Sequence, residues 1–220
     1  SIDYVVTKIP RWAFEKFPGA QDTLTVQMKS VGETMSIGRT FKESVQKAIR
    51  GLEIGRFGLG CDGKDKVESA QTLAALLDLM KTPTPKRIFQ VTEALRKGAS
   101  VQDIHTATGY DPWFIRQMLE IVQEEEGLRG NPPADAQGLR RAKQLGFSDV
   151  QLAVLWNKTE DEVRALRLAR GVTPGYRLVD TCAAEFEAYT PYYYSSYDGE
   201  DEVKLSDKER IIILGGGPNR

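Results

Sequence analysis

Residues 148–167 read SDVQLAVLWNKTEDEVRALR, and a window with the same pattern lies 48 positions earlier, where residues 100–119 read SVQDIHTATGYDPWFIRQML. A serine opens each window as a candidate N-cap, and a short segment with helical periodicity follows it. Gly109 in the first window and Asn157 in the second are residue types that tolerate the left-handed conformation at a helix end. A further capping residue and a second helical segment complete each window. The two windows therefore predict a repeated helical hairpin.

Helical patterns also extend on both sides of this repeat. Thr40 is a candidate N-cap with Glu43 at the third helical position, and apolar residues follow at spacings of three and four as far as Leu52. Glycine or Thr-Pro follows most of the later apolar segments, as expected at helix ends. The later helices are predicted at residues 67–81, 84–97, 100–107, 111–127, 135–145, 148–156 and 159–170. The fold class expected for the chain is therefore mainly α.

The flanks of the helical unit favour strands. Residues 4–9 are rich in β-branched side chains, and residues 24–29 alternate apolar and polar. The tyrosine-rich residues 189–197 are expected to form a connector. Residues 210–214 read RIIIL, a pattern typical of a buried strand, and glycines at 215–217 follow, an arrangement that often precedes a phosphate-binding helix. Two or three strands without a covering helix cannot fold alone, so we expect short β remnants of neighbouring α/β domains in a chain cut at both ends.

Composition excludes several classes of site and partner. The 220 residues include 40% apolar residues and carry a formal net charge of −1, so no strong field attracts nucleic acid or an anionic membrane. Cys61 and Cys182 lie far apart and His105 is the single histidine, which excludes a disulfide framework and any site that needs two histidines. These counts favour a reducing compartment. Apolar runs are far shorter than the ~20 residues of a membrane span, so no membrane partner is expected.

The hairpins leave open a second hypothesis, a free-standing helix-turn-helix module that binds nucleic acid. The second window carries Arg164, Arg167 and Arg170, but three acidic residues precede them, and residues 134–170 hold seven basic and five acidic residues. The first window runs into glutamates that would repel phosphate. Helical packing is therefore favoured, and no nucleic-acid partner is expected.

Glu33 is the carboxylate that stands out in the N-terminal flank. It follows Gly32 in the segment SVGETM, where the absence of a side chain allows another backbone or a ligand to come close. A turn glutamate in water is the alternative, and the residues alone do not exclude it.

Five segments resemble the carbamoyl phosphate synthetase large-chain family. They occur in the family's order and read SIDYVVTKIPR at 1–11, QMKSVGE at 27–33, IGRT at 37–40, VDTCAAEF at 179–186 and LGGGPNR at 214–220. The resemblance is looser through residues 56–170. In this family two similar halves, each with an ATP-grasp unit, are joined by a helical oligomerisation domain.

The resemblance implies a division of the chain into three parts. Residues 1–53 correspond to the end of the first ATP-grasp unit, which forms carboxyphosphate and then carbamate. Residues 54–205 correspond to the oligomerisation domain and the linker after it. Residues 206–220 correspond to the first strand and glycine-rich turn of the second half, which forms carbamoyl phosphate. The resemblance implies no catalytic, cofactor-binding or metal-binding residue within these 220 positions.

The resemblance also implies a function for the longer protein. It would make carbamoyl phosphate from bicarbonate and glutamine-derived ammonia for arginine and pyrimidine synthesis, in the cytoplasm, with ATP, Mg²⁺ or Mn²⁺, and K⁺. Its partners would be a small glutaminase chain and, through the helical domain, further copies of itself. Glu33 matches a family glutamate that lines an internal tunnel for carbamate. The chain itself would then be a non-catalytic oligomerisation and inter-domain scaffold.

Overall fold

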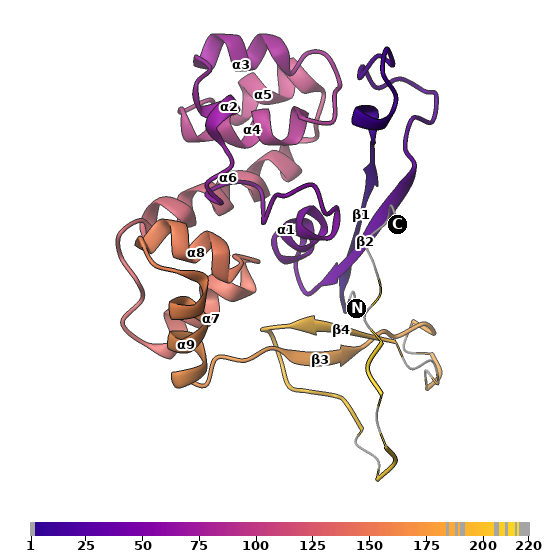
Figure 1. Ribbon diagram of the computed structural model, residues 1–220, viewed down its shortest axis with the longest axis vertical. Helices are drawn as coiled ribbons and strands as arrows, with labels where there is room; N and C mark the ends of the chain where they lie inside the picture. The colour runs from indigo at the N-terminus through magenta and orange to yellow at the C-terminus, as the bar shows by residue number, and fades with distance from the viewer. Residues whose placement is uncertain are drawn as a thin grey trace.

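The computed structural model describes residues 3–183, 185–187, 189, 192–204, 207–209, 211–213 and 215, and it confirms a mainly helical fold. Figure 1 shows a ribbon of strands β1 (Val5–Arg11) and β2 (Gly32–Gly38) beside helix α1 (Phe41–Gly51), with the other helices on the opposite side of α1. Those helices are α2 (Lys66–Ser69), α3 (Leu73–Leu79), α4 (Arg87–Arg96), α5 (Val101–Thr108), α6 (Pro112–Leu128), α7 (Ala136–Gln144), α8 (Asp149–Trp156) and α9 (Glu160–Ala169). A 3₁₀ turn, η1, spans Phe14–Lys16, and strands β3 (Gly175–Leu178) and β4 (Tyr193–Ser196) form a second small sheet.

The antiparallel β1–β2 ribbon covers α1 with one of its faces. Alternate residues of a strand point to the same face, and Thr34 and Ser36 of β2 are buried on the α1 side. The hydroxyls of Thr7 and Ser44 lie 2.6 Å apart and connect β1 with α1. The predicted start of α1 is confirmed, because the Thr40 side chain accepts a hydrogen bond from the backbone N–H of the third helical residue.

The repeated hairpin is confirmed as α5–α6 and α8–α9. Ser100 and Ser148 each form a reciprocal capping box with the third residue of the helix that follows. Gly109 and Asn157 end these first helices in the left-handed conformation, with φ of 72° and 53°. The second helix of each hairpin then begins at another side-chain cap. Local capping chemistry therefore sets both hairpins.

One apolar core joins α1 to the helical hairpins. Val45 and Ile49 of α1 belong to the same buried cluster as Ile104 of α5, Leu139 of α7 and Val163 of α9, and none of these five is more than 2% exposed. Burying one such side chain contributes about 1.5–3 kcal/mol. The segment that ends at Gly51 is thus held by the helices that follow it.

Two predicted elements differ from the structure. The strand predicted at residues 24–29 is wrong: this segment is a loop, with Val26 and Met28 fully or largely exposed. Alternation alone cannot make a strand where no neighbouring strand supplies hydrogen-bond partners. The helix predicted at residues 67–81 is two helices, because Thr72 caps a new start at α3.

The C-terminal strand is also not found where the structure describes the chain. Residues 211–213 belong to no strand, and their three isoleucine side chains are 85–88% exposed. A buried strand of this kind needs paired strands and covering layers, and β1–β2 and β3–β4 are the sheets of the described residues. Of the glycine-rich turn at 215–217, Gly216 and Gly217 lie outside the described residues.

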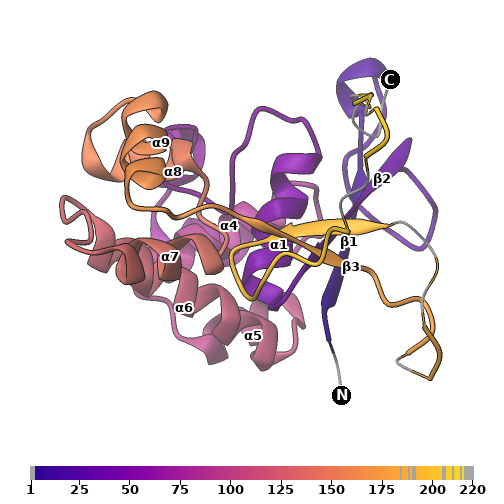
Figure 2. The ribbon, with the colours of Figure 1, turned by 90° about the horizontal axis from the view of Figure 1, so that it is seen from below.

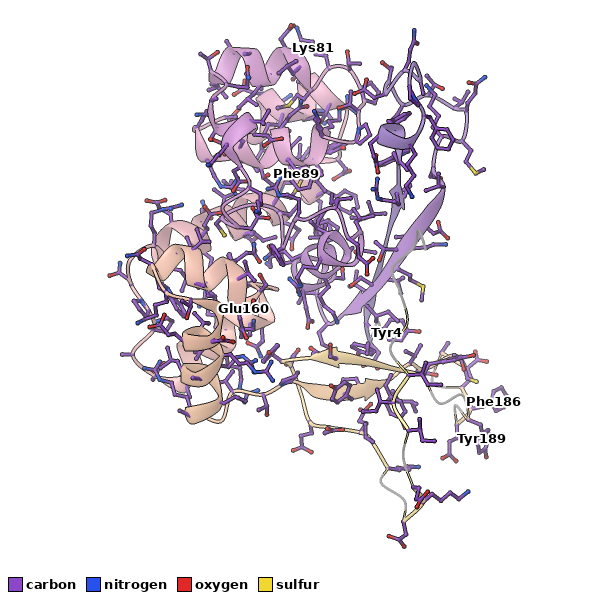
Figure 3. The ribbon with its side chains drawn as sticks, in the orientation of Figure 1. Tyr4, Lys81, Phe89, Glu160, Phe186 and Tyr189 are labelled. Atoms are coloured by element: carbon purple, nitrogen blue, oxygen red, sulfur yellow. The ribbon has the colours of Figure 1, made fainter. Side chains whose placement is uncertain are left out.

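The tyrosine-rich stretch includes β4, which pairs with β3; their sheet lies below α1 in Figure 1 and passes in front of α1 when seen from below (Figure 2). Tyr194 of β4 is buried, and its ring centroid lies 5.8 Å from that of Tyr4, at the start of the ribbon. The Tyr4 hydroxyl donates to the Asp180 carbonyl at 2.9 Å. Phe186 and Tyr189 lie far from the helices and are 75% and 87% exposed (Figure 3). Only some rings of this stretch therefore contact the ribbon: Tyr194 packs against Tyr4, whereas Tyr189 is exposed.

Candidate functional site

Glu33 lies within β2, on the ribbon face that points away from α1. The register sets Val6 opposite Ile37, Lys8 opposite Met35 and Pro10 opposite Glu33. Because side chains alternate between faces, these residues share one side of the ribbon. We call this side the open ribbon face; it consists of Val6, Lys8, Pro10, Glu33, Met35 and Ile37.

An ion pair occupies the middle of the open ribbon face. Lys8 Nζ lies 2.5 Å from Glu33 Oε1, and the two side chains are 53% and 54% exposed. Val6 and Met35, on the same face, are 44% and 61% exposed. Sequence reasoning singled out Glu33 and missed Lys8, because their diagonal proximity follows only from the strand register.

A buried carboxylate joins α1 to β4 on the other side of the ribbon. Glu43 accepts a hydrogen bond from the Ser196 hydroxyl at 3.2 Å, and burial raises the pKa of this carboxyl. Lys47, one turn further along α1, donates to the carbonyls of Ile37 and Ser195, both at 2.6 Å. Burial lowers the pKa of the Lys47 ammonium. These contacts tie three segments together: β2, α1 and β4.

A pair of buried amides joins α1 to the second hairpin. Gln151 Nε2 donates to Gln46 Oε1 at 3.0 Å and to the Gly60 carbonyl at 2.8 Å. Gln46 in turn donates to the Leu145 carbonyl at 2.9 Å. A Cβ on Gly58 would lie 2.2 Å from Gln151 Nε2, so the glycine leaves space for the amide. The sequence analysis missed this contact; the four glycines between residues 55 and 63 could have indicated a close approach, although nothing local indicates its partner.

A buried ionic cluster lies between α7, α8 and α9. Asp149 Oδ1 is 2.7 Å from Lys143 Nζ, and Asp149 Oδ2 is 2.9 Å from Arg167 Nη2. Arg167 also donates to the Val172 carbonyl at 3.0 Å. The Tyr197 ring covers both cations, with its centroid 5.3 Å from Lys143 Nζ and 5.8 Å from Arg167 Cζ. Burial lowers the pKa of Lys143 to about 8.

Intramolecular contacts engage two of the three arginines that a nucleic-acid-binding helix would need. Arg167 is buried beside Asp149, and Arg170 donates to the Pro133 carbonyl at 2.6 Å. Of the three arginines on which the helix-turn-helix hypothesis depended, Arg164 alone points to solvent without a hydrogen bond or ion pair in the described part of the chain. Three acidic residues at the start of α9 are exposed beside it. The arrangement does not support the nucleic-acid alternative.

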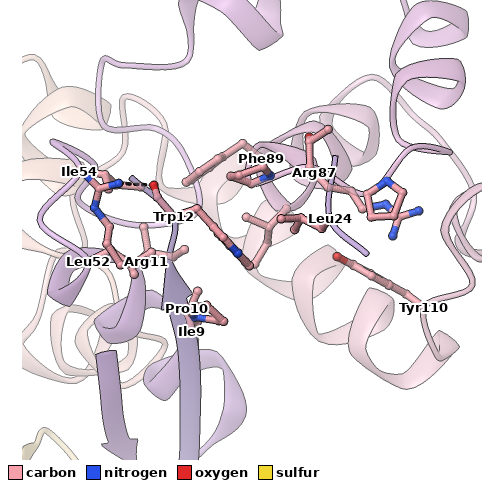
Figure 4. A pocket seen from close by; sticks show the side chains of 15 residues that line it. Ile9, Pro10, Arg11, Trp12, Leu24, Leu52, Ile54, Arg87, Phe89 and Tyr110 are labelled. Carbon is pink, nitrogen blue, oxygen red and sulfur yellow. Dashed lines mark hydrogen bonds between the residues drawn. The ribbon is translucent and has the colours of Figure 1, made fainter. Parts of the chain in front are cut away.

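A cavity of about 300 Å³ lies where the ribbon meets the helical unit (Figure 4). The Arg11 guanidinium at its edge donates to the Trp12 carbonyl, and Arg87 donates to the Met80 carbonyl at 2.6 Å. The rest of the lining is mostly apolar and includes Ile9, Pro10, Leu24, Leu52, Phe89 and Tyr110. No carboxylate lines this cavity, so its described walls hold no acid–base pair.

The hairpins expose apolar side chains at different places. On the first, Trp113 and Phe114 are 48% and 44% exposed and form an edge-to-face cluster with Phe41. On the second, Val154 and Leu168 are 46% and 48% exposed. These positions do not correspond under the 48-residue offset, so the two repeats present different outer surfaces.

The described residues hold no metal site of the usual kind. His, Cys, Asp and Glu side chains form no group of three that could bind an ion anywhere in this part of the chain. Cys61 is buried, and burial raises the pKa of its thiol well above the ordinary value. None of the helices that the structure describes has the length and apolar character required to cross a membrane.

Comparison with known proteins relates the whole chain to one group. Residues 33–171 match the family model described as "Carbamoyl-phosphate synthetase large chain, oligomerisation domain". Over its full length the chain is similar to carbamoyl phosphate synthase large chains from Synechocystis sp. (55% identical over 223 residues), Rhodopirellula baltica (53% over 226) and Archaeoglobus fulgidus (51% over 226). The chain spans about a fifth of the length of these relatives, 20% or 21% of each.

Proposed function

The chain belongs to the carbamoyl phosphate synthetase large-chain family, and from this we propose that it is a non-catalytic scaffold and self-association unit of such an enzyme. The shared core of α1 and the hairpins is the observation that carries the proposal. A scaffold must hold the parts that it joins in fixed relative positions, and close-packed side chains resist displacement.

Buried polar contacts between distant segments support the same role. Glu43 and Ser196 are 153 positions apart, and Gln46 and Gln151 are 105 apart. Buried polar groups that lose their partners cost about 1–3 kcal/mol each, so these contacts resist separation of the segments. The ribbon, the helices and β4 are thus expected to move together.

For the longer enzyme, we propose the activity implied by its relatives' name. It would form carbamoyl phosphate from bicarbonate and glutamine-derived ammonia in an ATP-dependent reaction of the ligase class, in the cytoplasm, for arginine and pyrimidine synthesis. A small glutaminase chain would supply the ammonia. Residues 1–53, 54–205 and 206–220 would belong to the first ATP-grasp unit, the oligomerisation domain with its linker, and the second half.

ATP, Mg²⁺ or Mn²⁺, and K⁺ are proposed for the longer enzyme and not for these residues. The described residues do not fit those groups, since they offer no acidic trio for a cation. A purified preparation of this chain is therefore expected to hydrolyse no ATP. Turnover above that of a buffer control, in a preparation free of contaminating ATPase, would contradict this proposal.

Self-association is the part of the proposal that this chain can test alone. The exposed apolar side chains of the hairpins provide surface that a second copy would cover. Light scattering over about a hundredfold range of concentration is expected to give a molar mass above 24.6 kDa that falls on dilution. A mass of 24.6 kDa at every concentration would contradict self-association as a property of this chain.

We further propose that Glu33 lines the path by which carbamate passes between the two ATP-consuming sites. Its position on the exposed ribbon face, away from α1, leaves the carboxylate available to such a path. A closed path protects a labile intermediate from water. In the full-length enzyme, Glu33→Ala is expected to lower the ratio of carbamoyl phosphate formed to ATP hydrolysed. An unchanged ratio would refute this role.

A further inference from the structure

We infer that Lys8 balances the charge of Glu33, and that together they make the open ribbon face an electrically neutral wall for an anion in transit. The inference rests on the proposed role of Glu33 in carbamate passage. What the structure adds is the partner: Lys8 Nζ lies 2.5 Å from Glu33 Oε1 across the ribbon.

The charge balance of the face gives the physical reason. Carbamate is a monoanion, and two like charges repel each other more strongly in a confined space of low dielectric constant than in bulk water. A lone carboxylate on the wall would therefore slow the anion, and a lone ammonium would retain it. A pair of opposite charges in contact does neither, because their fields largely cancel at the distance of a passing molecule.

The residues around the Lys8–Glu33 pair add no net charge to the open ribbon face. Val6 and Met35 are the exposed apolar side chains beside it. Arg11, further along β1, pairs with Glu15 at 2.5 Å. Among the six residues of the open ribbon face, Lys8 and Glu33 are the charged ones, so their sum sets the charge of the wall.

Because the Lys8–Glu33 pair is half exposed, its effect on the passage of the anion can be measured without a large effect on folding. With side chains 53% and 54% exposed, an ion pair contributes little to the stability of the fold. Lys8→Met and Glu33→Gln are thus expected to fold normally, and their effect can be measured as transfer between sites.

A double-mutant cycle in the full-length enzyme tests the inference. The measured quantity is the ratio of carbamoyl phosphate formed to ATP hydrolysed, with ATP hydrolysis at the first site and phosphoryl transfer at the second assayed separately as controls. Lys8→Met and Glu33→Gln should each lower the ratio roughly three- to tenfold, since each leaves one charge unpaired. The double variant should recover to within about twofold of the wild type, because the wall is neutral again.

Two further variants make the result specific. Lys8→Arg keeps the charge and should keep the ratio, which a purely steric role of Lys8 would not explain. Lys81→Met breaks the similarly exposed pair of Lys81 and Asp78 on the helical side and should leave the ratio unchanged.

The outcomes distinguish a failure of the neutral wall from a failure of the proposed role of Glu33. The neutral wall is wrong if Glu33→Ala lowers the ratio while Lys8→Met does not. It is also wrong if the loss in the double variant equals the product of the two single losses. In both cases the proposed role of Glu33 still stands. If neither Glu33 variant changes the ratio, the role of Glu33 fails and the inference fails with it.

Discussion

The hairpins α5–α6 and α8–α9 have the same capping pattern, yet the residue at one shared position, the third of the first helix, acts differently in each. Asp103 in the first hairpin and Gln151 in the second both accept a hydrogen bond from the backbone N–H of the capping serine. Asp103 is exposed, and Ser100 is its hydrogen-bond partner within the described residues. Gln151 is 1% exposed and also donates to Gln46 of α1.

The difference follows from the chemistry of the two side chains. An ionised aspartate only accepts hydrogen bonds, whereas a glutamine amide accepts through its oxygen and donates through its nitrogen. Gln151 therefore caps its own helix with one end and holds α1 with the other. One residue type at a repeated position therefore decides which hairpin makes this buried amide link to α1, whereas the first hairpin meets α1 through the ring of Phe41.

The two hairpins are expected to differ most in the cost of a substitution at the matching positions Asp149, in the second hairpin, and Val101, in the first. Asp149→Ala leaves Lys143 and Arg167 buried without their anion, which should lower the free energy of unfolding by about 3–5 kcal/mol. Val101→Ala, at the matching position, should cost about 1 kcal/mol. Urea unfolding measures both, and equal costs would show that the cluster does not stabilise the second hairpin.

A smaller difference is expected at the shared third position. Gln151→Ala removes the reciprocal half of the capping box, leaves the Gly60 carbonyl without its side-chain donor and leaves Gln46 Oε1 with the 3.4 Å bond from the Leu59 N–H, for a cost of about 2–4 kcal/mol. Asp103→Ala removes the cap alone and should cost about 1 kcal/mol. If the two variants unfold at the same urea concentration, the amide link to α1 contributes nothing measurable.

The pH dependence of the free energy of unfolding provides a second test of the buried ionic cluster. Burial lowers the pKa of Lys143 to about 8, so between that pH and about 10.4 the unfolded chain holds a proton that the folded chain has released. Stability contributed through Lys143 therefore rises with pH across this window, by at most about 1.4 kcal/mol per unit. Between about pH 7.5 and 9.5, wild type should gain about 1–2 kcal/mol relative to Lys143→Met; a constant difference would contradict the lowered pKa.

The smallest effects are expected at the left-handed caps. Gly109→Ala places a Cβ on a residue with φ of 72° and should cost about 1–2 kcal/mol. Asn157→Gly, at the matching position with φ of 53°, should change stability by less than about 0.5 kcal/mol. Thermal unfolding of the two variants distinguishes them, and a neutral Gly109→Ala would mean that the first hairpin can end without a left-handed residue.

The features that the sequence predicted well are those that neighbouring residues determine. Capping serines and left-handed residues lie within a few positions of the helices they bound, so both hairpins and the start of α1 could be located. The strand at residues 24–29 failed because strand formation needs a partner, which an alternating pattern does not supply. The contact of Gln46 with Gln151 could not be predicted for the same reason, since 105 positions separate them.

The candidate site shows the same limit. Glu33 could be singled out, through its glycine neighbour and then its family resemblance. Lys8 could not, because its distance from Glu33 depends on a register in which Val5 faces Gly38. A shift of one residue would move Glu33 to the α1 side of the ribbon.

The central claim is that the ribbon and the helical hairpins form one cooperative unit, and Trp12, next to the end of β1, allows a direct test. Trp12 lines the cavity at the end of the ribbon, and Trp156 of α8 is buried and donates to the Leu128 carbonyl at 3.0 Å. A variant with Trp113→Phe and Trp156→Phe retains Trp12 as its fluorescent reporter, while far-UV circular dichroism follows the helices of the same sample. In urea, the two signals should change at the same midpoint. A Trp12 transition that precedes the loss of helix would contradict the claim, because the ribbon would then unfold while the hairpins remain intact.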